Sequence, residues 1–420
     1  MTAPTNAPVD DSIAKLPWRT PMVVLAAGAV VVLLVFGLRS SFGLFLKPMS
    51  VDLGWGREVF ALAMAVQNLM WGATQPFASA IAEKWGAGRV IAAGGILYGV
   101  GLAMMAYATD PLTLNLTAGV MIGMAQAGGG LAVVLGAVAR ALPANRRTFG
   151  LGVVTAAGAA GQFTVVPGAQ ALMSSGLDWM PALLILATAA VFIVICGVPL
   201  AGKPNIRDAA SNAEKQDLGL AAALREASSH RGYWLLTLGF FVCGFHLAFI
   251  SIHLPAYLTD MGMAAEWGAW SLALIGVFNV IGSFGAGMLG DKYRKKSLLS
   301  GLYLLRALSI LFFIVVPLSE ISVILFSSAL GLLWLSTIPL TSGLVAHMFG
   351  PRYMGTLFAI VFFSHQLGSF LGVWLGGYFY DTTGSYMPVW WAGVALGVAA
   401  ALVHWPISEE RTPAVAQPAS

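Results

Sequence analysis

The sequence has little charge and almost no cysteine. Charged residues make up 10% of the 420 residues, whereas hydrophobic residues make up 58%. Soluble globular domains carry about 25% charged residues, so this composition excludes a soluble domain. The only cysteines, Cys196 and Cys243, lie within apolar stretches. Two such residues support neither a disulfide framework nor a metal site.

Long apolar runs dominate the rest of the chain. About 20 apolar residues cross a hydrocarbon core of roughly 30 Å as a helix. Twelve such stretches follow one another, at residues 21–46, 58–82, 88–108, 112–139, 148–174, 179–200, 232–258, 266–290, 297–317, 320–347, 354–380 and 386–406. The sequence therefore predicts an all-α polytopic membrane protein with twelve transmembrane helices.

The basic residues predict the orientation in the membrane. With a cytoplasmic N-terminus, all but four of the 22 Lys and Arg residues fall on the cytoplasmic side; the exceptions are Lys47 and Arg57 outside, and Arg39 and Arg306 within helices. This distribution obeys the positive-inside rule. The first 20 residues lack the apolar core of a signal peptide. We expect a multi-pass protein of the cell membrane, inner or plasma, with both termini cytoplasmic, and we read its basic clusters as topology signals and not as a nucleic-acid surface.

Negative charge is missing from the interior of the apolar stretches. Arg39 and Arg306 lie deep inside such stretches, but none of the 18 acidic residues does. A cation near the bilayer centre costs roughly 2.5 to 3.5 kcal/mol and is usually retained because it meets a partner in a cavity. A guanidinium suits a carboxylate because its planar fork donates two parallel hydrogen bonds. The asymmetry therefore predicts an anionic ligand.

The chain divides into two similar halves. Residues 201–231 are its longest polar interruption, and we expect a cytoplasmic linker there with a short amphipathic helix around residues 218–227. Six apolar stretches lie on either side, in bundles at 21–200 and 232–406, flanked by tails at 1–20 and 407–420. A loop from Glu83 to Arg89 follows the second stretch, and a loop from Asp291 to Lys296 follows the eighth. These similar loops at matching positions predict that the chain consists of two repeats of six helices each.

These features resemble the major facilitator superfamily over about residues 20 to 406. The segment Gly287-x-Leu289-x-Asp291 with its basic tail is similar to that superfamily's loop motif. Within the superfamily, the segments 37–45, 54–57 and 331–336 resemble monocarboxylate transporters and the related oxalate/formate exchangers. The resemblance implies two pseudo-symmetric six-helix bundles around a central pathway, with alternating access. It also implies a cytoplasmic latch involving Glu83, Arg89, Asp291 and Arg294.

The same resemblance separates the two arginines. It implies that helices 1, 2, 4, 5, 7, 8, 10 and 11 line the pathway, which places Arg39 on a lining helix and Arg306 on peripheral helix 9. Arg39 is therefore the expected carboxylate ligand. Alternatively, Arg39 snorkels to the outer interface or forms part of a gate. For Arg306 we expect snorkelling or hydrogen bonds to carbonyl groups at a contact between helices.

Histidines are the available proton carriers. Animal monocarboxylate transporters have an aspartate and an arginine on helix 8, but the corresponding positions here are Asn279 and Ser283, so proton symport cannot be carried over from that family. His246, His253 and His365 have ordinary pKa values near 6.5, and modest changes in their surroundings could gate protonation. The alternative is that each is a neutral hydrogen-bonding residue.

Several uncharged polar and aromatic residues could complete a binding site. They are Gln67, Trp71, Gln126, Gln162, Asn279, Trp334 and Gln366. Amides inside a bundle need partners, but a neighbouring helix serves as well as a substrate. Trp334 could stack on a substrate or fill space. Glycines at four-residue spacing, Gly368, Gly372 and Gly376, predict close packing of helix 11.

Taken together, these patterns predict a secondary active transporter of a small organic anion, a monocarboxylate above all, with protons as a possible coupling ion. An alternative is an exporter or facilitator of a neutral or amphipathic solute, with Arg39 as a gate; a membrane sensor on the same scaffold is a third. The sequence carries no nucleotide-binding loop, HExxH segment or nucleophile motif, so no enzyme and no cofactor is expected. Beyond substrate and lipid, no obligate protein partner is predicted.

Overall fold

The computed structural model describes residues 18–201, 220–350 and 354–410 of the chain. In the first half these residues form α1 (Pro21–Asp52), α2 (Arg57–Trp85), α3 (Ala87–Ala106), α4 (Pro111–Leu114), the π-helix η2 (Asn115–Met121), α5 (Ile122–Gly128), α6 (Leu131–Ala141), α7 (Ala144–Ser174) and α8 (Trp179–Gly197). Polar side chains cap two of the helix starts. The Thr20 hydroxyl accepts from the Val23 amide at α1, and the Asp110 carboxylate accepts from the Thr113 amide at α4, which satisfies otherwise orphaned donors.

The second half repeats this pattern after a short helix. Its elements are α10 (Leu220–Ser229), α11 (Arg231–Asp260), α12 (Ala265–Lys292), α13 (Lys295–Val315), α14 (Glu320–Leu333), α15 (Thr337–Phe349), α16 (Met354–Thr383) and α17 (Met387–His404). The position of α10 agrees with the short helix predicted at 218–227. The remainder of the predicted linker, residues 202–219, lies outside the described residues.

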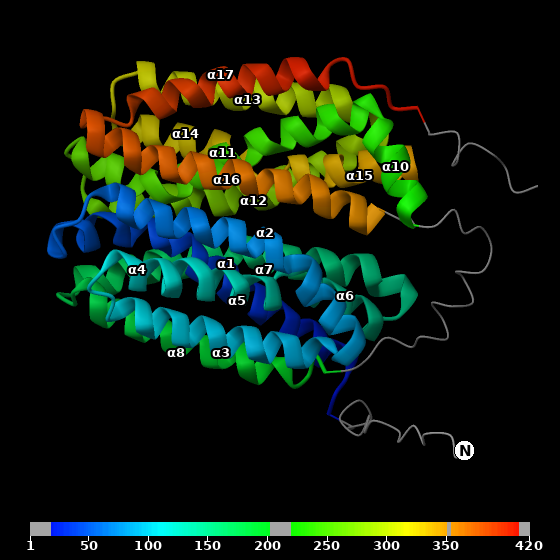
Figure 1. The fold of residues 1–420 in the computed structure, drawn as a ribbon, viewed down its shortest axis with the longest axis horizontal. Coiled ribbons are helices and arrows are strands. Elements are labelled where there is room, and N and C mark those ends of the chain that lie inside the picture. The colour runs from blue at the N-terminus through cyan, green and yellow to red at the C-terminus, as the bar shows by residue number, and fades with distance from the viewer. Residues whose placement is uncertain (1–17, 202–219, 351–353, 411–420) are drawn as a thin grey trace, which may run out of the picture.

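The predicted twelve-helix architecture is confirmed. Residues 111–141 and 320–349 each cross as one interrupted span, and eleven helical spans among the described residues are long and apolar enough to cross a membrane. The twelfth, α2, has 29 residues but is less apolar, because Gln67, Asn68 and Gln75 interrupt it. The start of α1, helix α10 and the end of α17 lie at the same end of the molecule, which we call the terminal end (Figure 1). We call the opposite end the distal end.

Helix packing repeats from one half to the other. In the first half α1 packs on α7, α2 on α5 and α3 on α8; in the second half α11 packs on α16, α12 on α14 and α13 on α17. These are the same pairs in the same order along each half, which is the architecture of a structural repeat. Across the halves, α2 packs on α16, α7 on α12 and α1 on α11. The interface between the halves therefore consists of α1, α2 and α7 against α11, α12 and α16.

Glycine permits the closest of these contacts. A Cβ atom at Gly368 or Gly372 would collide with backbone atoms of α11, and one at Gly376 would collide with the His253 ring. The predicted glycine stripe of helix 11 is therefore confirmed as a packing surface. It brings α16 against α11, the helix that carries His246 and His253.

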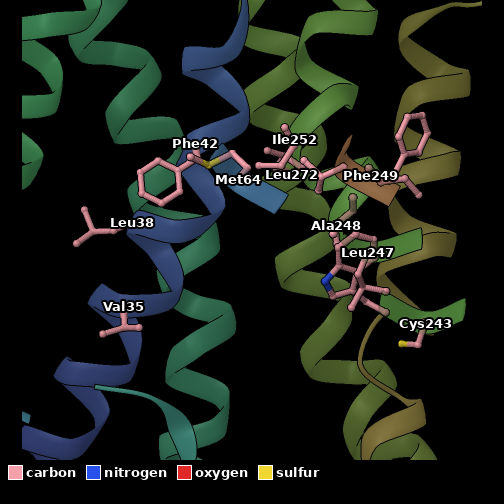
Figure 2. Close-up of a cluster of buried hydrophobic side chains, with 14 of the residues drawn as sticks. Val35, Leu38, Phe42, Met64, Cys243, Leu247, Ala248, Phe249, Ile252 and Leu272 are labelled. Carbon is pink, nitrogen blue, oxygen red and sulfur yellow. The ribbon is translucent and has the colours of Figure 1, made fainter. Parts of the chain in front are cut away.

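An apolar layer closes the interface between the two halves. It lies between the middle of the helices and their distal end. Figure 2 shows Phe42 of α1 and Met64 of α2 in one row with Ile252 of α11 and Leu272 of α12. All four side chains are nearly inaccessible to solvent. Gly43 brings α1 so close to α11 that a Cβ atom there would collide with the Ser251 carbonyl. The apolar layer separates the distal end from the residues around Arg39, one helical turn nearer the terminal end.

Candidate functional site

Arg39 of α1 lies against α2 and, among the described residues, bonds one side-chain acceptor. Its Nη2 donates to Asn68 Oδ1 over 2.6 Å, and its guanidinium carbon lies 5.1 Å from the centre of the Trp71 ring. Its Nε is buried and has no hydrogen-bond partner, while the residue as a whole is only half-buried. Within the described residues Arg39 forms no ion pair with a carboxylate. No carboxylate in the described part of the chain therefore balances its charge.

Aromatic contacts connect Arg39 with the second half. The Trp71 ring packs edge-on against Phe36 and against Phe362, with centroid distances of 6.2 and 5.4 Å. Phe362 in turn stacks on the His365 ring at 5.7 Å with an interplanar angle of 9°. We call Arg39, Asn68, Trp71, Phe362 and His365 the central cluster. Sequence reasoning selected Arg39, Trp71 and His365 but missed Asn68 and Phe362.

Gln366 lies next to the central cluster. Its Oε1 is 3.1 Å from His365 Nδ1, while its Nε2 is buried without a hydrogen-bond partner. Gly72 of α2 allows this approach, because a Cβ atom there would collide with the Gln366 side chain. The central cluster and Gln366 together therefore contain one cation, one histidine and an unused amide donor, but no acid.

Two predicted amides hold helices together in this conformation. Gln126 Nε2 donates to Gln67 Oε1 over 3.0 Å, and Gln67 Nε2 donates to the Ala118 carbonyl over 2.7 Å. Both side chains are almost completely buried. They join α2 to η2 and α5, which is the neighbouring-helix alternative of the sequence analysis. Gln162 instead crosses the interface, because its Nε2 donates to the Leu272 carbonyl of α12 over 2.9 Å.

The remaining predicted residues, Asn279 and Trp334, lie at a break in the tenth span. Between α14 and α15, residues 334–336 leave the helix. Asn279 Oδ1 accepts from the Leu335 amide over 3.1 Å. Arg306 Nη2 donates to the carbonyls of Leu333 and Trp334, and its side chain is completely buried. Carbonyl bonding, and not snorkelling, is therefore the observed role of Arg306.

The three predicted histidines lie at different places in the structure. His246 Nε2 is 2.8 Å from the Gly393 carbonyl of α17, and His253 Nε2 is 2.8 Å from the Val373 carbonyl of α16. Both rings are buried within the second half. Only His365 lies in the central cluster. For His246 and His253 the geometry favours the hydrogen-bonding alternative over proton transfer at the interface.

An ion-pair network joins the two halves at the distal end. Arg57 at the start of α2 donates through Nη2 to Asp260 Oδ1 over 2.9 Å and through Nη1 to the Tyr386 hydroxyl over 2.6 Å. Its guanidinium carbon lies 3.7 Å from the centre of the Tyr380 ring. Lys47 of α1 pairs with the same Asp260 at 2.9 Å. Arg57 is buried, so this pairing is protected from solvent.

Asp381 fixes the first turn of α2 to α16. Its two carboxylate oxygens accept from the backbone amides of Arg57 and Glu58, over 2.9 and 2.8 Å. A Cβ atom at Gly56 would collide with this carboxylate. Glu58 Oε1 also accepts from Trp374 Nε1 over 2.9 Å. Sequence reasoning missed this distal network, although the segment Gly54-Trp55-Gly56-Arg57 had been noted for its resemblance.

The predicted latch residues are not engaged in this conformation. Glu83, Arg89, Asp291 and Arg294 are exposed and form no ion pair within the described residues. In this described part of the chain, the hydrogen bonds and ion pairs that join the halves lie at the distal end, apart from the Gln162 bond nearer the middle. The latch stays a prediction for another conformation.

A separate pocket of about 900 Å³ opens at the distal end. Its lining comes from both halves and includes Gly43, Lys47, Asp52, Trp179 and Glu266. Lys47 and Asp52 lie beyond the apolar layer, so this pocket and the central cluster are on opposite sides of that layer. The distal pocket therefore does not surround Arg39.

Comparison with known sequences gives one family. The family model described as Major Facilitator Superfamily matches residues 28–373 and 270–420. An uncharacterized MFS-type transporter of Bacillus subtilis (strain 168), YcxA, is 24% identical over 369 residues, which cover 83% of this chain and 86% of the relative. Monocarboxylate transporter 11 of Mus musculus is 29% identical over 388 residues, which cover 87% of this chain and 82% of the relative.

Two solved structures share the fold. The crystal structure of a D-xylose-proton symporter matches with a TM-score of 0.72 at 14% identity, over 93% of this chain and 99% of the other. A bacterial homologue of the human lysosomal transporter Spinster, in an inward-facing and occupied conformation, matches with a TM-score of 0.74 at 15% identity, over 95% of this chain and 100% of the other. At these identities the likeness concerns the fold alone.

Proposed function

Because the chain belongs to the Major Facilitator Superfamily, we propose that it is a secondary active transporter of a small organic anion, in particular a monocarboxylate. The observation that carries this proposal is Arg39. It is a permanently charged group beside Trp71, which contacts Phe362 of the second half, and the described chain offers it one amide oxygen and no carboxylate. A substrate carboxylate would supply the missing acceptors for Nε and Nη1 in a bidentate pair.

The neighbours of Arg39 suit a short organic acid. The Trp71 ring lies beside the guanidinium, and Phe36 and Phe362 flank that ring. These apolar surfaces would contact the carbon chain of the substrate while Arg39 holds its carboxylate. The likeness to monocarboxylate transporter 11 of Mus musculus supports the same substrate class.

We further propose that this conformation opens to the cytoplasm. The terminal end carries most of the basic residues, which the positive-inside rule assigns to the cytoplasm, while the apolar layer and the distal network close the other end. Alternating access then consists of rocking the bundles at 21–200 and 232–406 against each other. In the outward-open state the distal network separates, and Asp291, Arg294, Glu83 and Arg89 would meet at the terminal end.

Proton coupling, where it occurs at the interface, would involve His365. It is the histidine that stacks on Phe362 and so lies within the central cluster. A protonated His365 would attract the same substrate anion as Arg39, which would couple proton and anion binding. The fold shared with a D-xylose-proton symporter is compatible with such coupling.

Uptake into proteoliposomes tests the proposed function. Purified protein is reconstituted, and entry of radiolabelled lactate and pyruvate is compared with entry of lactamide, with and without an inward proton gradient. The proposal predicts saturable carboxylate uptake that Arg39→Ala abolishes and that Asp52→Asn, a change at the distal end, leaves intact. Equal uptake of lactate and lactamide would instead favour a carrier of neutral solutes, for which the aromatic side chains would form the site and Arg39 a gate.

A further inference from the structure

The distal pocket is a cavity that both halves build and that the proposed carboxylate site does not use. Its volume of about 900 Å³ lies in the range of small-molecule binding sites. One wall comes from the ends of α1 and α7 and the start of α8, and the other from the end of α11 and the start of α12. Lys47 lines the pocket and also pairs with Asp260 in the distal network. The pocket therefore lies beside the contacts that join the halves at this end.

Most of the side chains that line the distal pocket are apolar. Trp179 contributes its indole ring, Met173 and Met180 contribute thioethers, and Pro255 contributes to the opposite wall. Trp179 Nε1 donates to Asp52 Oδ2 over 2.9 Å, which fixes the indole. Methionine side chains adapt to ligands of different shapes. These walls suit the apolar body of an organic molecule.

The charged groups of the distal pocket are three carboxylates and one ammonium. They belong to Asp52, Asp178, Glu266 and Lys47. The Lys47 ammonium is already offset by Asp260 at 2.9 Å. Asp178 precedes α8 without capping it, and neither Asp178 nor Glu266 pairs through its side chain with another described residue. The pocket therefore carries an excess of negative charge.

Gln170 of α7 adds a buried acceptor to the pocket. Its side chain is only 8% exposed, and its Nε2 donates to Ser174 Oγ over 3.2 Å. Its Oε1 accepts no hydrogen bond within the described residues, and a buried acceptor without a donor is costly. Nowhere in this part of the chain do three His, Cys, Asp or Glu side chains converge as a metal site would require. The acceptors of the pocket therefore suit an organic donor and not a metal ion.

We propose that the distal pocket binds an amphipathic organic cation, an amine whose apolar body packs on the walls while Asp178, Glu266 and Gln170 Oε1 attract its ammonium group. Asp178 belongs to the first half and Glu266 to the second, so the bound amine contacts both halves. It thereby stabilises the conformation in which the distal end is closed, because a ligand shifts a protein toward the state that it binds. The existence of this site does not depend on the proposed function; its effect on carboxylate transport does.

Thermal unfolding of the full-length protein in a neutral detergent tests the binding. The probes are 1-naphthylmethylamine, which is a cation at pH 7, and 1-naphthylmethanol, which is uncharged and nearly the same shape. The amine should raise the melting temperature at concentrations where the alcohol does not. The increase should shrink as salt is added, because salt screens the carboxylates. Equal shifts by amine and alcohol, or no shift by either, would overturn the proposal.

Asp178→Asn and Glu266→Gln test the position of the site. Each removes one carboxylate from one wall and should weaken amine binding about two- to fivefold, as expected for a partly exposed ion pair; the double variant should lose about fourfold or more. Glu320→Gln is the matched control, because Glu320 is likewise exposed in the first turn of a helix but does not line the pocket. Calorimetric titration with the amine measures the affinities. Full affinity in the double variant, or an equal loss in the control, would contradict this position.

Cysteine labelling tests whether the amine holds the halves together. Met64 lies in the apolar layer and is buried, so a membrane-impermeant maleimide should reach Met64→Cys, with both native cysteines replaced by serine, when the distal end opens. At ten times its dissociation constant, an amine that binds the closed state alone should slow labelling about tenfold. An unchanged or faster rate would overturn the bridging of the halves. If the wild-type protein moves no carboxylate, the proposed function fails, and amine binding and labelling still decide this proposal.

Discussion

Arg39 and Arg306 occupy equally apolar stretches of sequence, but the structure treats them differently. Arg306 is completely buried in the second half, where it bonds the carbonyls that end α14. Arg39 is half-buried beside α2, with one amide oxygen as its acceptor among the described residues. Backbone carbonyls accept from Arg306, whereas the buried Nε of Arg39 has no acceptor in the described part of the chain.

The acceptors around an interior arginine indicate whether it serves the fold or a ligand. A cation in the membrane must be offset by some acceptor, because its transfer out of water is costly. Where backbone carbonyls at a helix break supply that acceptor, the residue stabilises the fold. Where the acceptor is missing at an interface between moving halves, the residue is available for a ligand.

The largest effect is expected from Arg39→Ala. Loss of one partner of a desolvated charge pair costs about 2 to 5 kcal/mol, so carboxylate uptake should fall about 30-fold or more. The melting temperature of the substrate-free protein should change little, because among the described residues Arg39 makes one side-chain hydrogen bond, to Asn68. Lactate uptake in proteoliposomes and thermal unfolding of the same preparation measure the two quantities. Normal uptake by a well-folded Arg39→Ala protein would remove the carboxylate clamp.

Arg306→Ala should show the opposite pattern. It leaves the buried Leu333 and Trp334 carbonyls without their donor, and a buried acceptor left unsatisfied costs about 1 to 3 kcal/mol of folding free energy. The melting temperature should drop strongly, while the folded fraction still binds lactate. Arg306→Lys, which keeps the charge, is the control. An unchanged melting temperature in Arg306→Ala would contradict the structural role.

The distal network provides an intermediate effect. Asp260→Asn weakens the contacts to both Arg57 and Lys47 and should shift the protein toward opening of the distal end. Labelling of Met64→Cys by a membrane-impermeant maleimide, with both native cysteines replaced by serine, reports this opening. We expect about tenfold faster labelling, equivalent to about 1.4 kcal/mol. Asp52→Asn is the matched control, because Asp52 bonds Trp179 within the first half; equal rates in both variants would exclude the network as a gate.

The smallest effect is expected at the terminal end. Asp291 is exposed and unpaired among the described residues of this conformation, so Asp291→Asn should leave lactate affinity unchanged. If the latch forms in the outward-open state, turnover should decrease several-fold, because one state of the cycle is destabilised. Steady-state uptake and equilibrium binding separate the two quantities. A selective loss of binding would speak against a latch.

The sequence predicted the architecture well because the signals are local. Apolar runs of helical length, separated by polar loops, specify the spans, and matching loops specify the repeat. The same holds for Arg39, because an arginine inside an apolar run is recognised from the sequence without knowledge of its neighbours in space. Trp71 and His365 were predicted one at a time, but nothing in the sequence predicted that Phe362 would connect them.

The distal network and the helix break needed three-dimensional information. Arg57, Asp260 and Asp381 are far apart in the chain and each is ordinary at a helix end, so only the docking of the halves reveals their pairing. The break at residues 334–336 contains no proline or glycine and continues an apolar run. Gln67 and Gln126 lie on helices of the expected pathway. Their amides face each other because helix packing sets the rotation of each helix about its own axis.

The most direct test of the central claim is the thermal stability of wild-type protein and Arg39→Gln with carboxylates and their neutral amides. Lactate and pyruvate at 100 times their dissociation constants should stabilise wild type by about 2.7 kcal/mol, provided that unfolded protein does not bind them. The account predicts a shift with lactate, none with lactamide, and no shift with either in Arg39→Gln. Equal stabilisation by lactamide, or a lactate shift that survives in Arg39→Gln, would contradict it.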